Sequence, residues 1–134
     1  MKGWHFYAIL AVIVWGVWGF LTKWSVDKLG SLQAYLAISL GAIILPIFFI
    51  PFIHLPAINL PFWIAVGTGI LGSIGTLLLA RAFTTGQTNV VIPITAQYIL
   101  VTVILARLFY QEHLPLTRII GIILSILAII LLSK

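Results

Sequence analysis

The sequence predicts an all-α integral membrane protein built as a bundle of five transmembrane helices. Of its 134 residues, 63% are hydrophobic and only 7% are charged, whereas a soluble domain carries about 25% charged residues. The mean hydropathy is +1.26. The apolar residues fall in five runs, and a helix needs about 20 such residues to cross a hydrocarbon core of about 30 Å. We therefore expect one transmembrane domain over residues 1–134.

The first helix is expected at residues 4–22. It is an apolar run that ends before Lys23. A short polar connection with Asp27, Lys28 and Gly30 is expected to stop the helix and turn the chain back.

The second helix is expected at residues 31–53 and the third at residues 60–83. Pro46 and Pro51 lie in the distal half of the second run. Proline lacks an N–H donor and clashes with the preceding turn, so we expect a kink or an early end there. The third run begins after a turn between the prolines at 56 and 61.

The fourth helix is expected at residues 89–110, with Pro93 in its first turns and no interruption before Arg107. The fifth is expected at residues 115–133 and opens at Pro115, a favoured residue at a helix start. The loops are about four to ten residues long by this assignment. They leave no room for a soluble domain, so neighbouring helices must alternate in direction.

The basic residues show little bias between the two sides of the membrane. Five crossings put the termini on opposite sides, and orientation is normally set by an excess of Lys and Arg on the cytoplasmic side. Either the protein inserts in both orientations, or the arginines of the last two helices lie too deep to count and one orientation prevails. The N-terminal side carries Lys2, Arg107 and Arg118, and the other side carries Lys23, Lys28, Arg81 and Lys134.

The stretch from Ala80 to Gly121 contains several features in a characteristic order. An Ala-rich helix end is followed by a short turn, a Pro-bearing helix, a Glu at its far end and a Gly in the last helix. The residues are Ala80, Ala82, Gly86, Pro93, Glu112 and Gly121, and the match extends to Trp15-Gly16. This order resembles the C-terminal half of an EamA domain, the repeat unit of the drug/metabolite transporter superfamily.

The resemblance implies a half-size member of that family. Typical members carry two five-helix repeats of opposite topology, with the substrate site at their interface near the midplane. This chain resembles one repeat of such a ten-helix transporter. Met1 and the polar Ser133-Lys134 ending are those expected of a complete reading frame.

The resemblance implies a multi-pass transport protein in a prokaryotic plasma membrane. We expect an exporter or facilitator of small polar or amphipathic metabolites such as amino acids. It would work by alternating access in an antiparallel homodimer or with an oppositely oriented paralogous partner. Two alternatives stay open: a flippase for lipids or lipid-linked sugars, and a non-transporting accessory membrane subunit.

The candidate substrate-binding residues lie on polar faces of the first and fourth helices. Tryptophan and tyrosine are normally enriched at the membrane interface, yet some of these aromatic residues fall near mid-helix. An indole N–H or a phenol at that depth needs an internal partner or a ligand. Ordinary core packing is the competing interpretation. The candidates are Trp15, Trp18, Thr95, Gln97, Tyr98 and Thr102.

Two further helices carry polar or small faces by their three/four spacing. In the second helix these residues are Ser31, Tyr35 and Ser39, and in the third they are Gly69, Gly72, Ser73 and Thr76. Small residues in membrane helices usually mark close helix packing. We interpret the face of the third helix in that way, along with Gly121, Ser125 and Ala128 of the fifth.

The residues that the sequence lacks exclude several kinds of chemistry. There is no cysteine, and no catalytic motif or cofactor-binding motif, so an enzyme is not expected. The seven basic residues border apolar runs, so they are read as headgroup anchors facing membrane lipid and not as a nucleic-acid surface.

The ionisable residues lie at helix ends. Asp27 and Glu112 are the only carboxylates, which argues against a proton antiporter with a carboxylate inside the membrane. Glu112 matches a family position, and its simpler role is an ion pair with Arg107 or Arg118. The three histidines share the N-terminal side without local ligand spacing, so no metal site is predicted. They are His5, His54 and His113.

Overall fold

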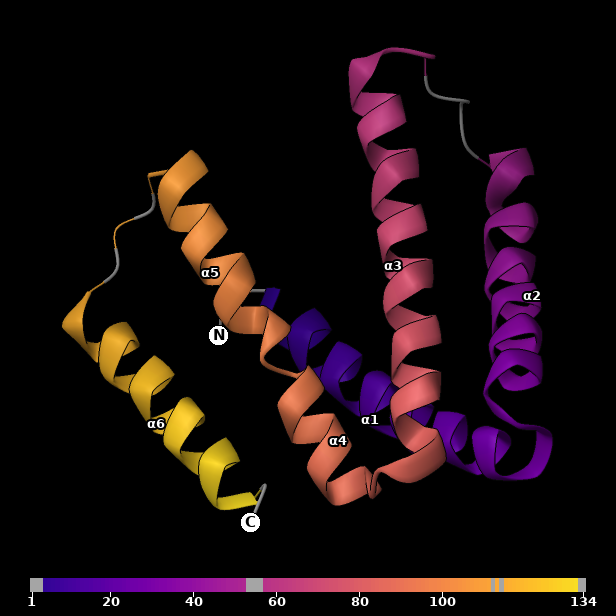
Figure 1. Ribbon diagram of the computed structural model, residues 1–134. Helices are drawn as coiled ribbons and strands as arrows, with labels where there is room; N and C mark the ends of the chain where they lie inside the picture. Colours follow the sequence, from indigo (N-terminus) through magenta and orange to yellow (C-terminus); the bar gives the residue numbers. More distant parts are fainter. Residues whose placement is uncertain (1–3, 53–56, 112, 114, 133–134) are drawn as a thin grey trace. The chain divides into compact units, whose positions relative to one another are not determined.

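The computed structural model describes residues 4–52, 57–111, 113 and 115–132 (Figure 1). In these residues every regular element is a helix. The chain forms two compact units, Met1–Thr85 and Gly86–Lys134. The first unit contains α1 (Trp4–Leu29), α2 (Ser31–Phe49), the 3₁₀ turn η1 (Ile50–Phe52) and α3 (Leu60–Thr85), and the second contains α4 (Thr88–Thr95), α5 (Tyr98–Phe109) and α6 (Leu116–Leu132).

Four apolar segments in the described residues are long enough to cross a membrane. They are α1, α2 continued by η1, α3, and α4 together with α5, and they measure 22 to 26 residues each. The fifth predicted span corresponds to α6, an apolar helix of 17 residues. The structure thus confirms an all-helical membrane protein, whereas the number of five membrane crossings stays a prediction.

The end of α1 differs from the predicted one. The helix continues to Leu29, so Lys23, Asp27 and Lys28 are helical, and the prediction of a polar connection at these residues is wrong. Lys23 and Asp27 are four residues apart and pair across one helical turn, which favours the helix. The reversal into α2 takes only Gly30, whose φ of +83° is a backbone conformation that suits glycine.

The second helix ends early, as its prolines predict. Pro46 stays inside α2, which ends at Phe49, and Pro51 lies in the short turn η1. The third helix runs to Thr85, two residues beyond the predicted end.

The first unit packs most closely at one end. In Figure 1, α2 and α3 stand side by side in opposite directions, and α1 meets them where α2 begins. The residues buried in this unit gather at that end, and Phe83 and Ala34 are fully covered. They are Gly19, Thr22, Val26, Ser31, Ala34, Ala80 and Phe83.

The small-residue face of α3 does not pack closely within this unit. A methyl group built on Gly69 or Gly72 would meet no atom within 4 Å. The same holds for Gly121 in α6. No side chain of their own unit packs closely on these glycines, so their role in helix packing stays a prediction.

The fourth predicted helix is interrupted. Its two parts, α4 and α5, are separated by a turn at Ala96 and Gln97. The prediction of a continuous helix from Pro93 to Arg107 is therefore wrong. Pro93 itself stays inside α4, and hydrogen bonds of the tighter 3₁₀ type replace the α-helical pattern at the turn that follows α4. Within the second unit, α4 packs against α6.

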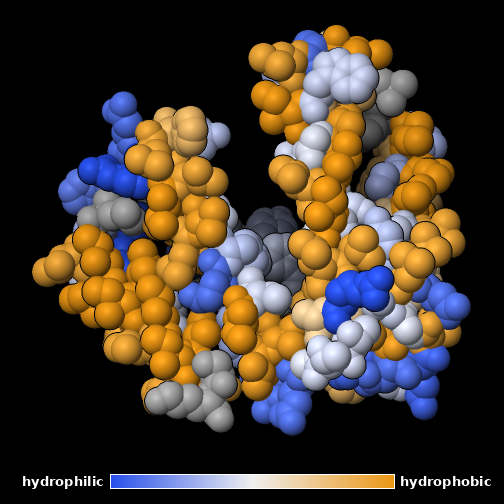
Figure 2. All heavy atoms as spheres, viewed as in Figure 1, coloured by the Kyte–Doolittle hydropathy of each residue, from blue (hydrophilic) through white to orange (hydrophobic). Residues whose placement is uncertain are grey.

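The outer surface of both units is apolar. Hydrophobic residues cover most of the face shown in Figure 2, and hydrophilic residues gather mainly near helix ends. In α2 and α3, no residue of the most apolar 18-residue stretch is buried. Patches of this size require lipid or another protein to cover them.

Candidate functional site

The interruption between α4 and α5 lies midway along a membrane-length apolar segment. Thr88–Phe109 is that segment, and Gln97 is near its centre. Three backbone hydrogen bonds there span three residues and not four, the pattern of a 3₁₀ turn. They run from Gln97 N to Ile94 O (3.1 Å), from Ile99 N to Ala96 O (3.2 Å) and from Leu100 N to Gln97 O (2.9 Å).

Gln97 is part of this turn, and Tyr98 follows it directly. Gln97 is half-buried, and Tyr98 is 56% exposed. Within the described residues, neither the Gln97 amide nor the Tyr98 hydroxyl makes a side-chain hydrogen bond. In hydrocarbon, each unsatisfied polar group costs several kcal/mol. These two groups therefore require water, another protein segment or a solute beside them.

Thr95 and Thr102, the neighbouring candidates, already use their hydroxyl protons. The Thr95 hydroxyl lies 2.9 Å from the Val91 carbonyl and 3.0 Å from that of Ile92. The Thr102 hydroxyl donates to the Tyr98 carbonyl over 3.1 Å. Their oxygens can still accept a hydrogen bond, but their donors are occupied by their own helices.

The two tryptophan candidates belong to the first unit and differ in their surroundings. Trp18 lines an open hollow of about 300 Å³ between α1 and α2, close to the lower limit for a small-ligand site. Trp15 is not part of the hollow, and 61% of its surface is exposed. The residues that line the hollow are Val14, Val17, Trp18, Leu21, Thr22, Ser25 and Ile38.

The hollow offers mainly apolar contacts. Its two hydroxyls donate to their own helix, from Thr22 to the Trp18 carbonyl (2.8 Å) and from Ser25 to the Leu21 carbonyl (2.9 Å). The Trp18 indole N–H, which has no hydrogen-bond partner among the described residues, is the remaining donor there. The structure thus brings Thr95, Gln97, Tyr98 and Thr102 together in one unit and places Trp18 on a hollow in the other.

Lys23 makes a contact between helices that the sequence analysis missed. Its ammonium group lies 2.5 Å from the Asp27 carboxylate and 3.1 Å from the Phe83 carbonyl. Phe83 is in the last turn of α3, where carbonyls lack helical partners, so a lysine there acts as a cap. The spacing of Lys23 and Asp27 was the available signal for a helical pair, whereas the Phe83 contact has no signature in the sequence.

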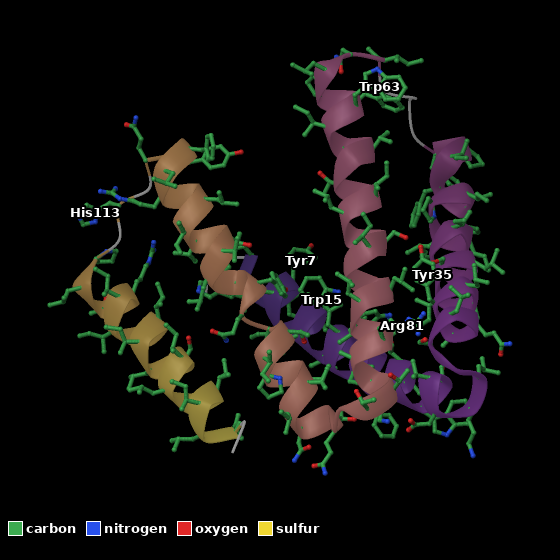
Figure 3. All side chains as sticks on the ribbon, viewed as in Figure 1. Tyr7, Trp15, Tyr35, Trp63, Arg81 and His113 are labelled. Atoms are coloured by element: carbon green, nitrogen blue, oxygen red, sulfur yellow. The ribbon has the colours of Figure 1, made fainter. Side chains whose placement is uncertain are left out.

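The remaining ionisable candidates contribute no arrangement that would hold a metal. Among the described residues, no group of three or more His, Cys, Asp or Glu side chains lies together. His113 is exposed in the segment between α5 and α6, as labelled in Figure 3. Glu112 and His54 lie outside the described residues.

Comparison with known proteins decides the family. A model of the EamA-like transporter family matches residues 2–134. The chain belongs to the EamA-like transporter family. This is a family of membrane transporters and not a family of enzymes. The resemblance stated from the residues between Ala80 and Gly121 is confirmed.

One relative in this family comparison is an uncharacterized protein of Methanocaldococcus jannaschii. It is 42% identical over 69 residues, which make up 52% of this chain and 50% of the archaeal one. The match thus covers about half of the relative's length. No solved structure matches the chain significantly.

Proposed function

We propose that this EamA-family protein moves small polar or amphipathic metabolites, such as amino acids, across a prokaryotic plasma membrane, as an exporter or facilitator. The observation that carries this proposal is the interrupted fourth segment with Gln97 and Tyr98 at its centre. Irregular backbone at membrane depth is tolerated where it is buried in protein or lines a water-filled cavity. Substrate sites of secondary transporters lie near the midplane at such discontinuous helices.

The groups at the interruption suit a polar solute without covalent chemistry. The Gln97 amide can donate and accept hydrogen bonds, and the Tyr98 phenol can do both as well. The Tyr98 ring and the neighbouring Ile94 and Ile99 offer apolar contact for an amphipathic molecule. Asp27 lies in the last turn of α1, paired with Lys23, so it does not supply the mid-membrane carboxylate of a proton antiporter. Downhill export or exchange fits these groups best.

The proposed working unit is an antiparallel homodimer. The family's usual site is formed between two repeats of opposite topology, and this 134-residue chain resembles one such repeat. The exposed apolar faces of its helices leave room for a second copy, and the weak charge bias permits insertion in both orientations. An oppositely oriented paralogous partner would serve the same purpose.

The orientation test uses two single-cysteine variants, because the chain has no native cysteine. Lys28→Cys and His113→Cys lie on opposite predicted sides of the membrane. Intact cells are labelled with a membrane-impermeant maleimide. Partial labelling of similar extent at both positions supports the homodimer. Labelling at only one position overturns it and points to a paralogous partner.

The transport test uses proteoliposomes that contain this protein alone. Exchange of radiolabelled amino acids is compared between the wild type, Gln97→Leu and the matched control Gln33→Leu, an exposed glutamine near the start of α2. Saturable exchange that is lost only in Gln97→Leu supports the proposal. Exchange that survives in Gln97→Leu contradicts the role of the interruption.

The apolar hollow beside Trp18 favours one second candidate. Its lining suits an acyl chain better than a polar metabolite, as expected for a flippase of lipids or lipid-linked sugars. The same proteoliposomes, loaded with a fluorescent phospholipid, distinguish the two functions. Lipid movement that is lost in Trp18→Ala, together with no amino acid exchange, would replace the first candidate by the second.

A further inference from the structure

We propose that hydroxyl groups between α2 and α3 form a separate polar site within the first unit, which binds the carboxylate of the transported solute. The group comprises Tyr35 and Ser39 of α2 and Ser73 of α3, and we call it the hydroxyl cluster. This inference rests on the proposed transport function and adds a site in the first unit that the sequence analysis did not assign to substrate.

Tyr35 and Ser73 form the centre of the cluster. Their oxygens lie 2.6 Å apart, and either hydroxyl can be the donor. Figure 3 shows the Tyr35 side chain on the side of α2 that faces α3. The pair has two O–H donors, and the bond between them uses only one. Neither oxygen makes another hydrogen bond within the described residues, so one donor is left over.

Ser73 differs in this respect from other hydroxyls in the helices. Thr68 donates to the Ile64 carbonyl (3.0 Å), and Thr76 donates to the Gly72 carbonyl (3.0 Å). Both thus satisfy their donors within α3, the usual behaviour of Ser and Thr in membrane helices. Ser73 lies between them on the same helix and bonds across to α2 instead.

Ser39 supplies a second donor on the same side of α2. It follows Tyr35 by four residues, so the two share one face of the helix. Ser39 is half-buried, and its hydroxyl has no hydrogen-bond partner within the described residues. The hydroxyl cluster therefore presents two O–H donors without acceptors.

There is room for a ligand beside these donors. Gly69 and Gly72 precede Ser73 in α3, and a methyl group on either would meet no atom within 4 Å. Since α2 and α3 are antiparallel neighbours, residues after Tyr35 in α2 run beside residues before Ser73 in α3. Ser39 therefore lies along the stretch of α3 that carries these glycines.

The chemistry of the cluster selects the kind of ligand. Two O–H donors require two acceptor atoms, and a carboxylate provides two oxygens in one group. Ser73 is near the middle of α3 (Leu60–Thr85), at the depth where secondary transporters place their substrates. Hydrogen bonds to an ionised acceptor are stronger than those between neutral groups, so neutral hydroxyls can hold an anion there.

The test measures ligand binding by calorimetry in lipid nanodiscs. The probes are leucine and phenylalanine, each compared with the amine that has the same side chain but no carboxylate. Wild type is compared with Tyr35→Phe, Ser39→Ala and Ser73→Ala. Tyr110→Phe and Thr68→Val are matched controls, because Tyr110 is exposed at a helix end and Thr68 bonds within α3. Loss of one bond to a carboxylate should weaken binding about 10-fold or more.

The expected result is a weaker affinity of the cluster variants for amino acids, an unchanged affinity for the amines, and no change in the controls. A purely structural hydroxyl pair would weaken both classes of probe equally, and that outcome overturns the inference. Amino acids that bind wild type no better than the amines overturn it as well. The proteoliposome test with Gln97→Leu does not depend on this binding result. The transport proposal can therefore hold even if the hydroxyl cluster does not bind a carboxylate.

Discussion

The third and fourth apolar segments of this EamA-family protein have similar hydropathy but different backbones. α3 is a continuous helix of 26 residues, whereas Thr88–Phe109 breaks into α4 and α5 at Ala96 and Gln97. In α3, the hydroxyls of Thr68 and Thr76 donate hydrogen bonds to backbone carbonyls of the same helix. The amide and phenol at the break of the fourth segment have no such partner in the described residues. Two segments of similar hydropathy can thus differ in backbone continuity and in how their polar side chains are satisfied, and the proposed solute pathway rests on this difference.

Removal of the amide at the break should have the largest effect. Gln97→Leu keeps the side-chain size but eliminates both hydrogen-bonding atoms, so kcat/KM for exchange should fall at least about 10-fold. Uptake into proteoliposomes measures this loss. Equal losses in Gln33→Leu would show that any glutamine is needed for assembly, and the contrast between the two segments would disappear.

Removal of the Lys23 cap should lower stability without acting on the break. Lys23→Met loses the bonds to Asp27 and to the Phe83 carbonyl, in a side chain that is 24% exposed. The expected loss of unfolding free energy is about 1–2 kcal/mol, which is measured as a lower thermal midpoint in detergent. Lys28→Met is the control, because Lys28 is exposed at the end of the same helix. An unchanged midpoint in Lys23→Met would mean that the Lys23 bond to the Phe83 carbonyl contributes nothing to stability.

The phenol beside the break should matter less than the amide. Tyr98→Phe keeps the ring and loses one hydroxyl, so exchange should weaken about fivefold, the size of one neutral hydrogen bond. Tyr110→Phe makes the same chemical change at an exposed helix end and should leave the KM unchanged. If both variants behave alike, the position of Tyr98 at the break has no special role.

The tryptophans should show the smallest difference. Trp18 lines the hollow between α1 and α2 and Trp15 does not, so Trp18→Leu should reduce exchange about two- to threefold more than Trp15→Leu. This corresponds to the lower part of the range for a single aromatic contact. Uptake by the two variants, corrected for the amount of folded protein, measures it. A larger loss in Trp15→Leu would reverse this assignment.

Much of the fold follows directly from the sequence. Long apolar runs predict the helices because only a helix satisfies its backbone within hydrocarbon. Pro51 predicts the end of α2 because proline has no backbone N–H to donate to the preceding turn. The family order from Ala80 to Gly121 identified the transporter family. Each of these features depends on residues that are close to one another in the sequence, so the sequence alone predicts it.

The features that the sequence did not predict depend on neighbours in space. Pro93 signals a weakened helix, but the break falls three residues later, and the position of such a turn depends on packing around it. The Tyr35–Ser73 bond joins residues 38 apart, and nothing in either helix identifies its partner. Asp27 and Lys23 look like loop residues by composition, although their spacing allows a helical pair. Gly69 and Gly72 lie on a side of α3 that its own unit leaves open, so their role in close packing stays a prediction.

The most direct measurement is the water accessibility of the break itself. Single cysteines at Gln97 and Tyr98, and at Leu71 near the middle of α3 as an exposed apolar control, are treated with a water-soluble thiol reagent in native membranes. If the break lines a solute pathway, Gln97→Cys and Tyr98→Cys react while Leu71→Cys does not. Protection of the first two by a transported amino acid would support a shared site. If all three are equally unreactive, the break is buried in lipid or protein, and the proposed pathway is contradicted.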